Sequence, residues 1–383
     1  MKDKSGFIKG LICGIVIAFA VSFLLNGRGV LVGQEAKKLR EIDGIISTKY
    51  VDDYDKEILI EDMYKGYVAG VGDKYTSYMP KEEMEALLQS TNGVFYGVGI
   101  VISHDASDRA VIISVIEDTP AYEAGILPGD ILIEVEGESV SGRELSEITA
   151  MVKGEPETEV NLTFVKYPDG EIYTKSLKRA QIDIPSVYGK MLENNIGYME
   201  ITQFSENTYD QFMKELKTLQ DEGMDSLILD LRNNLGGRFD TVQKITDELV
   251  PEGVIVYTED KNGEKEYSYA DDKFLDLPLC ILVNEYTASA SEVLSGAVQD
   301  RGTGVLVGTK TFGKGLVQGL YTLKDGSGLK VTIQKYYTPN GVCINGEGLT
   351  PDYDVALPDG YSSFSYVPED EDTQLQKAIE ILS

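Results

Sequence analysis

The spacing of apolar residues changes twice along the chain and divides it into stretches of different texture. From residue 31 to about 90, apolar side chains recur at helical spacing, as at Leu39, Ile42 and Ile46, which predicts short amphipathic helices. From Gly93 to about residue 180, short β-type runs are broken by glycine and proline, which predicts a compact all-β module with one or two helices. After about Pro185, strands alternate with helical stretches, as in an α/β core.

The same patterns locate individual elements within these stretches. In the β module we expect strands at 100–103, 110–116, 131–135 and 160–165, and a helix at 143–152. In the α/β core we expect strands at 226–231 and 279–283, a helix at 208–222 and a terminal helix at 369–383.

A long apolar run lies at the N-terminus. The run from Phe7 to Leu25 is about long enough to cross a bilayer core, and Lys2, Lys4 and Lys9 precede the uncharged stretch that begins at Gly10. This charge distribution favours a cytoplasmic N-terminus and an extracytoplasmic body, in a single-pass protein of the cell membrane. A cleavable signal peptide is the alternative, but no small-x-small cleavage site stands out after Leu25.

The charge balance and the rarity of histidine exclude several functions. The formal net charge of −29 repels phosphate backbones, so nucleic acid is not an expected partner. The single histidine, His104, excludes any mechanism or metal site that needs two. The three cysteines are far apart and match neither a zinc spacing nor a disulfide framework, so we expect no metal and no cofactor.

Two glycines, Gly97 and Gly99, lie just before the first strand of the β module. In the run Gly97, Val98, Gly99, Ile100 the backbone amides can turn inward and form a nest for a carboxylate. A run from Pro120 to Asp130 and an alternating strand follow. Residues 92–180 thereby resemble a PDZ domain; the alternative is a β domain with two ordinary turns. The resemblance implies that a peptide adds beside strand 100–103, with its terminal carboxylate on the amides of residues 97–100 and helix 143–152 as the other wall.

A candidate nucleophile lies where strand 279–283 gives way to a helix. Ser289 is at this turn, near the positive end of the helix dipole, and Thr287 is interpreted as a capping residue. Because His104 belongs to the PDZ-like module, a lysine is the available base. Segment 309–318 is interpreted as a strand with Lys310, Lys314 and Gln318 on one face, and composition alone leaves both lysines open.

A double glycine follows strand 226–231. The amide of Gly236 or Gly237, together with that of Ala290, is the predicted oxyanion hole. A phosphate loop is the alternative, but no lysine and Ser/Thr pair follows it. Another serine-lysine pattern, Ser327 to Lys330, matches S-x-x-K of penicillin-binding enzymes; without the companion S-D-N and K-T-G motifs it is interpreted as a turn.

Segments 284–292 and 308–318 resemble the carboxyl-terminal processing proteases, and the likeness extends from about residue 35 to 355, including 73–78, 336–341 and 346–352. The resemblance implies that Ser289 is the nucleophile, Lys314 the general base and Gln318 the residue that orients the lysine. It also implies a crotonase-like α/β core with an inserted PDZ domain that gates access to the dyad.

These inferences combine into one expected organisation. We expect a cytoplasmic N-terminus and transmembrane anchor at 1–28, a helical region at 29–91, a PDZ domain at 92–180, a protease core at 181–357 and a C-terminal tail helix at 358–383. The expected function is a serine endopeptidase that recognises the C-terminal tails of protein substrates and cuts them through an acyl-enzyme. The alternative is a non-catalytic PDZ adaptor at the cell surface. The N-terminal helices are compatible with a homodimer.

Overall fold

The structure is a computed structural model that describes residues 33–383. The predicted membrane span, Phe7 to Leu25, lies outside the described residues. None of the helices within residues 33–383 combines the length and the apolar character that a bilayer crossing requires. The chain forms two compact units, with the division between Met63 and Tyr64.

The first unit contains α2 (Gln34–Lys49) and the start of α3 (Lys56–Ala69). Both helices lie in the stretch where helical spacing predicts them. Neither helix has a buried residue, and apolar side chains such as Ile42, Ile45 and Ile58 are exposed. Two helices without a fully buried apolar side chain gain little tertiary stabilisation within this unit.

A six-stranded sheet forms the centre of the second unit. Its strand order is β10-β11-β12-β15-β16-β19, in which only β10 runs antiparallel to its neighbour. The strands are β10 (Val187–Met191), β11 (Ile196–Ile201), β12 (Ser226–Asp230), β15 (Leu279–Val283), β16 (Gly304–Gly308) and β19 (Tyr353–Asp354). β12 and β15 are buried along their whole length, as expected for parallel strands that are covered on both faces.

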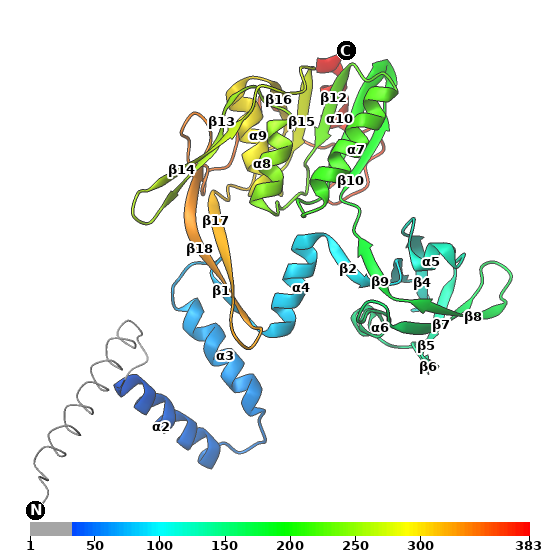
Figure 1. Ribbon diagram of the computed structural model, residues 1–383, viewed down its shortest axis with the longest axis vertical. Helices are drawn as coiled ribbons and strands as arrows, with labels where there is room; N and C mark the ends of the chain where they lie inside the picture. Colours follow the sequence, from blue (N-terminus) through cyan, green and yellow to red (C-terminus); the bar gives the residue numbers. More distant parts are fainter. Residues whose placement is uncertain (1–32) are drawn as a thin grey trace, which may run out of the picture. The chain divides into compact units, whose positions relative to one another are not determined.

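Helices cover both faces of this sheet (Figure 1). On one face, Leu229 and Ile281 share a large apolar cluster with α7 (Thr208–Asp221), α8 (Phe239–Asp247) and α9 (Ala290–Arg301). On the other face, Ile228 and Cys280 pack with α10 (Thr373–Leu382). Alternate residues of one strand therefore belong to different clusters, which gives a three-layer α/β core.

A second, antiparallel sheet adjoins the core, with the order β1-β18-β13-β14 and β17 paired to β18. Its strands are β1 (Ser77–Met79), β13 (Gly253–Asp260), β14 (Lys265–Ala270), β17 (Leu316–Thr322) and β18 (Gly328–Tyr337). Through β1, a segment near the start of the second unit pairs with one about 250 residues later: Ser77 lies opposite Lys330. This pairing positions residues 73–76 for the site described below.

The β module has its own sheet and its own apolar cluster. The sheet order is β3-β4-β5-β7-β8, with strands β3 (Ile100–His104), β4 (Ala110–Val115), β5 (Ile131–Val135), β7 (Glu159–Val165) and β8 (Ile172–Lys178), while β6 (Glu138–Ser139) pairs with β5. Two helices, α5 (Pro120–Glu123) and α6 (Leu145–Val152), complete it. A two-stranded ribbon, β2 (Val94–Gly97) with β9 (Ala180–Asp183), carries the chain into and out of the module (Figure 1). Helix α4 (Lys81–Asn92) precedes β2.

The mixed α/β core and the β module with two helices confirm the coarse fold prediction. Two predictions of secondary structure are wrong. Residues 328–330 of the S-x-x-K stretch belong to β18 and not to a turn. Segment 309–318 is not the single strand that its pattern predicts. In the structure β17 begins only at Leu316, and Gly313 adopts a left-handed φ of 86°. Lys314 therefore precedes the strand and does not share a face of it with Gln318. The crotonase-like assignment and the domain boundaries stay predictions.

Candidate active site

Ser289 connects the buried strand β15 to α9. Its backbone has φ 58° and ψ −116°, a conformation that is strained for any residue except glycine. The turn before it is fixed by Thr287, which is buried and donates its hydroxyl to the carbonyl of Leu231 at 2.9 Å. Thr287 thus fixes the turn and does not cap α9, whose N-cap is Ser289, so the predicted capping role is wrong. Ser289 itself lines a cavity of about 540 Å³.

Glu292 lies one turn into α9 and is completely buried. Its Oε2 accepts the amides of Ser289 and Lys314, both at 2.9 Å. Its Oε1 accepts the amide of Gly313 at 2.7 Å and the hydroxyl of Thr311 at 2.6 Å. Four donors compensate the buried negative charge, and two of them belong to the proposed nucleophile and base. Glu292 is therefore a positioning residue that fixes both backbone segments.

Lys314 lines the same cavity as Ser289. Its Nζ lies 4.9 Å from the ring centre of Tyr75, a cation–π geometry. Burial, and secondly the positive charge of Lys330, lower the pKa of Lys314, while Glu292 and Asp73 act in the opposite direction. Lys310, the other lysine that the sequence left open, is exposed and is not among the residues that line this cavity.

Gln318 also lines the cavity, but its amide donates to the Oγ1 of Thr332, at 3.5 Å. The Thr332 hydroxyl in turn donates to Asp73 at 2.6 Å. Within residues 33–383 no hydrogen bond joins Gln318 to Lys314. That Gln318 orients Lys314 stays a prediction. In this arrangement the two residues line the same cavity.

The glycine pair after β12 lies beside Ser289. A Cβ on Gly236 would come within 2.9 Å of both the Ala290 nitrogen and Ser289 Cβ, so only glycine fits there at its φ of 102°. The Gly236 amide already donates to the Oδ1 of Asn234 at 2.8 Å. Among the described residues the amides of Gly237 and Ala290 have no acceptor. Of the two predicted alternatives, the Gly237 amide is the one that remains available to an oxyanion.

Within the described part of the chain, no hydrogen bond joins Ser289 Oγ to Lys314 Nζ. Both side chains nevertheless line one cavity. The rest of its wall is largely apolar, with Leu87, Leu235, Phe239, Leu316, Val317 and Leu320. A cavity of this kind holds an apolar side chain next to a serine, a lysine and two free amides.

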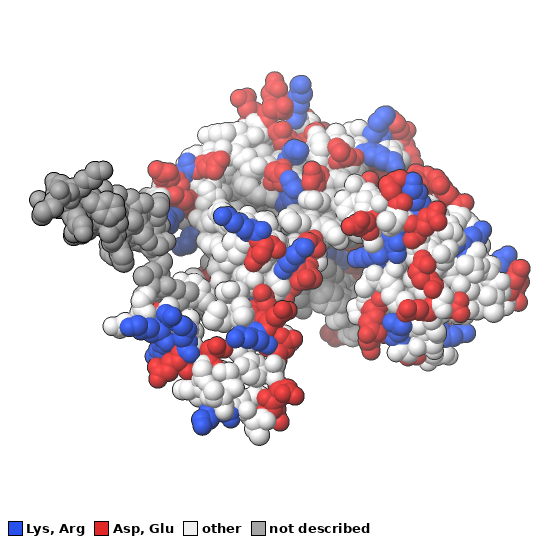
Figure 2. Space-filling view, turned by 60° about the horizontal axis from the view of Figure 1, so that its bottom comes forward, with Lys and Arg blue, Asp and Glu red and all other residues white. Residues whose placement is uncertain are grey.

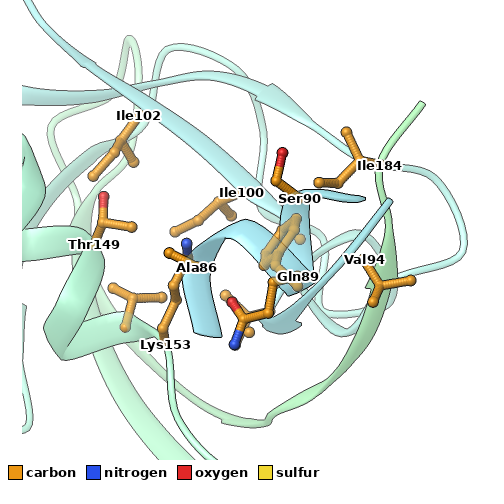
Figure 3. A pocket seen from close by; sticks show the side chains of 14 residues that line it. Ala86, Gln89, Ser90, Val94, Ile100, Ile102, Thr149, Lys153 and Ile184 are labelled. Carbon is orange, nitrogen blue, oxygen red and sulfur yellow. The ribbon is translucent and has the colours of Figure 1, made fainter. Parts of the chain in front are cut away.

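A second pocket lies at the groove predicted for peptide termini (Figure 3). Gly97, Val98, Gly99 and Ile100 line it together with Thr149 and Val152 of α6. The amides of Val98 and Gly99 have no acceptor among residues 33–383, while their carbonyls accept from Ala121 and Ile116. At Gly99 a Cβ would lie 2.2 Å from Thr119 Oγ1, so the loop requires glycine. This geometry suits a terminal carboxylate.

Helix α4 contributes to both pockets. Ala86, Gln89 and Ser90 line the groove in Figure 3, whereas Leu87 and Thr91 line the cavity that holds Ser289. Residues 86 and 90, and residues 87 and 91, are each four positions apart and form two neighbouring sides of the helix. The two pockets are thus separated by one helix.

His104 is remote from this chemistry. It ends β3 in the β module, and its Nδ1 lies 3.1 Å from Oδ1 of Asp108. It does not line the cavity that holds Ser289. The prediction that the histidine does not serve as the base is consistent with this position.

Sequence reasoning missed several residues that form the site. The pairing of β1 with β18 brings Tyr75 and Asp73 close to Lys314. No local sequence pattern predicts this long-range contact. Tyr336 donates its hydroxyl to the carbonyls of Ser289, at 2.9 Å, and of Lys314, at 2.5 Å. Glu292 reads in the sequence as an ordinary first-turn glutamate. For Tyr75 and Tyr336, the available signal was that both fall in segments that resemble the protease family.

Two family models match the chain. Residues 111–166 match the PDZ domain, and residues 195–355 match peptidase family S41. Together they define a serine-type peptidase that carries a peptide-binding module.

Relatives cover nearly the whole length. The carboxy-terminal processing protease CtpA of Bacillus subtilis is 32% identical over 93% of this chain and 78% of its own. The carboxyl-terminal-processing protease of a Picosynechococcus strain is 37% identical over 82% and 77%. The chain belongs to the carboxyl-terminal processing proteases of peptidase family S41. Among solved structures, one from Bacteroides fragilis described as an S41 protease shares the fold, with a TM-score of 0.51, 18% identity, and coverage of 87% of this chain and 92% of that one.

Proposed function

We propose that this protease recognises the C-terminal tails of protein substrates through its PDZ domain and hydrolyses them with Ser289 and Lys314. The observation that carries the proposal is that Ser289, Lys314 and the unoccupied amides of Gly237 and Ala290 meet at one cavity. A nucleophile, a base of lowered pKa and two donors for an oxyanion are the parts that acyl transfer requires.

The proposed reaction begins with neutral Lys314. Its Nζ takes the proton of Ser289 Oγ as the oxygen attacks the scissile carbonyl, and the amides of Gly237 and Ala290 stabilise the oxyanion. The amine product leaves with the proton, and water then hydrolyses the acyl-enzyme by the same route. The proton transfer requires the two side chains to approach each other, an adjustment that commonly accompanies substrate binding. Gln318 would hold Lys314 during this approach.

The PDZ groove supplies the tail recognition in this proposal. An extended peptide adds as a strand along β3, its carboxylate on the amides of Val98 and Gly99. Ile100, Ile102 and Val152 line the pocket around the last side chain, which favours an apolar C-terminal residue.

The proposal also covers the location and the oligomeric state of the protease. The apolar run before residue 28 anchors the chain in the cell membrane, with the catalytic body outside the cytoplasm. The exposed apolar side chains of the first unit, such as Ile42, Ile45 and Ile58, favour a homodimer through that unit.

The test is cleavage of an unfolded reporter with an apolar C-terminal tail by the full-length chain in detergent. Ser289→Ala and Lys314→Ala should each abolish cutting, whereas Lys310→Ala should leave it within about twofold, because Lys310 is exposed away from the cavity. Amidating the reporter's C-terminus should weaken its binding to the Ser289→Ala variant. Cutting that survives in Lys314→Ala would refute the dyad, and binding without any cutting by the parent would favour the adaptor.

A further inference from the structure

The S-x-x-K stretch that sequence analysis interpreted as a turn has a different place in the structure. Only Ser327 precedes the strand; β18 begins at Gly328 and includes Lys330. Lys330 and Tyr336 both line the catalytic cavity, and Thr332, on the same face of β18, hydrogen-bonds Gln318. Because Tyr336 is fixed against the carbonyls of Ser289 and Lys314, β18 brings Lys330 into the cavity at a defined place.

Lys330 is a half-buried cation without a counter-ion. Within residues 33–383 no carboxylate lies within ion-pair distance of its Nζ. Arg238, which lines the same cavity, is paired with Glu206 at 3.3 Å and with Asp240 at 2.7 Å. Lys330 has no such partner among the described residues, although the chain carries 64 acidic and only 35 basic residues. Partial burial of a cation has a cost that an incoming anion offsets.

We propose that Lys330 binds an acidic side chain of the substrate, close to the scissile bond, and so acts as a specificity-determining residue. This proposal rests on the function proposed above. The apolar wall around Ser289 selects a neighbouring apolar residue. Lys330 is the one basic residue of the described wall that is neither ion-paired, as Arg238 is, nor assigned as the base, as Lys314 is. The preferred substrate segment therefore combines an apolar residue with a nearby Asp or Glu.

The test uses peptides that share one C-terminal tail and differ by a single Glu→Gln exchange at successive positions around the cleaved bond. An identical tail keeps the PDZ contribution constant. The full-length parent should cleave the Glu peptide about three- to fivefold better than the Gln peptide at one position, at low salt. Lys330→Met should abolish this ratio. Lys335→Met is the matched control, since Lys335 lies on the same strand but is exposed, and it should keep the ratio.

A charge reversal separates recognition from damage to the fold. Lys330→Glu should prefer a peptide with Lys over one with Gln at the same position. An unchanged Glu/Gln ratio in Lys330→Met, or a parent with no preference at any position, would overturn the proposal.

Binding to the Ser289→Ala variant, measured by fluorescence anisotropy of labelled peptides, gives a readout that does not need catalysis. If the parent never cleaves, the proposed function fails, yet the Glu peptide should still bind this variant more tightly than the Gln peptide. That difference should vanish when Lys330→Met is added. Equal binding of both peptides to the Ser289→Ala variant would count against Lys330 itself.

Discussion

Glu292 illustrates how much of the site depends on one buried charge. Its carboxylate accepts hydrogen bonds from Ser289, Gly313, Lys314 and Thr311 and so connects the start of α9 to the loop that carries Lys314. Replacing it would leave several donors without an acceptor, each at a cost of roughly 1–3 kcal/mol. In the sequence the same residue resembles an ordinary capping glutamate, because its burial is not visible there.

The partly buried Lys314 should reduce the stability of the protein. Its pKa is lowered, so at pH values between the folded and unfolded pKa the unfolded chain binds more protons, and stability rises with pH. Below the folded pKa the full cost of the buried cation is present. Lys314→Met should therefore be inactive but have a higher Tm at pH 7, with a difference that narrows as the pH approaches about 10.

Thermal unfolding of both proteins between pH 6 and 10 checks this expectation, with Lys310→Met as the control. In the parent, kcat/KM should rise with pH as Lys314 loses its proton. An activity maximum near pH 5, or a Tm that falls in Lys314→Met, would be incompatible with a buried lysine base.

At the scale of elements, α10 depends on its N-cap residue, Asp372. Asp372 is buried, caps α10 by accepting the amides of Gln374 and Leu375, and pairs with Arg232 at 2.8 Å. Asp372→Ala should destabilise the fold by about 2 kcal/mol, because the cap is lost and, within the described residues, the half-buried Arg232 keeps only Asp230 as a carboxylate partner. Urea unfolding measures the change. Asp370→Ala, at an exposed position two residues earlier, should stay within about 0.5 kcal/mol, and an equal loss there would contradict the assignment.

Local patterns predicted the elements well where the periodicity is strong. The sequence pattern of strands that alternate with helical stretches correctly predicts three elements of the core. They are the fully buried strands β12 and β15 and the amphipathic helix α7. The prediction failed at 309–318, where Gly313 leaves the extended conformation and Gly315 packs so closely on Asn345 that a Cβ would lie 2.7 Å from its nitrogen. Such contacts depend on residues distant in the sequence.

The candidate site was predictable only in part for the same reason. Ser289 lies on a strand-to-helix turn, which a local pattern reveals, and the glycine pair after β12 follows a recognisable strand. Lys314 was separated from Lys310 only by family resemblance. Tyr75, which faces the lysine, reaches it through pairing of β1 with β18, and no spacing in the sequence encodes that pairing.

At the scale of the whole molecule, the net charge of −29 should govern how substrates arrive. Acidic side chains are spread over the visible face, with lysines and arginines between them (Figure 2). An unfolded substrate rich in lysine should therefore be cleaved faster at low salt, with kcat/KM falling severalfold as the ionic strength rises to about 0.5 M. For a substrate rich in Asp and Glu with the same tail, kcat/KM should rise with ionic strength. Equal salt dependence for both would exclude long-range steering.

The position of α4 between the two pockets sets a lower limit on product length. A chain whose carboxylate rests beside Val98 must pass around the helix before its backbone reaches Ser289. A helix with its side chains is about 10 Å across, and an extended residue covers about 3.3 Å. If the tail binds and is cut as proposed, at least about three residues lie beyond the cut, so the expected products are short peptides and not single amino acids.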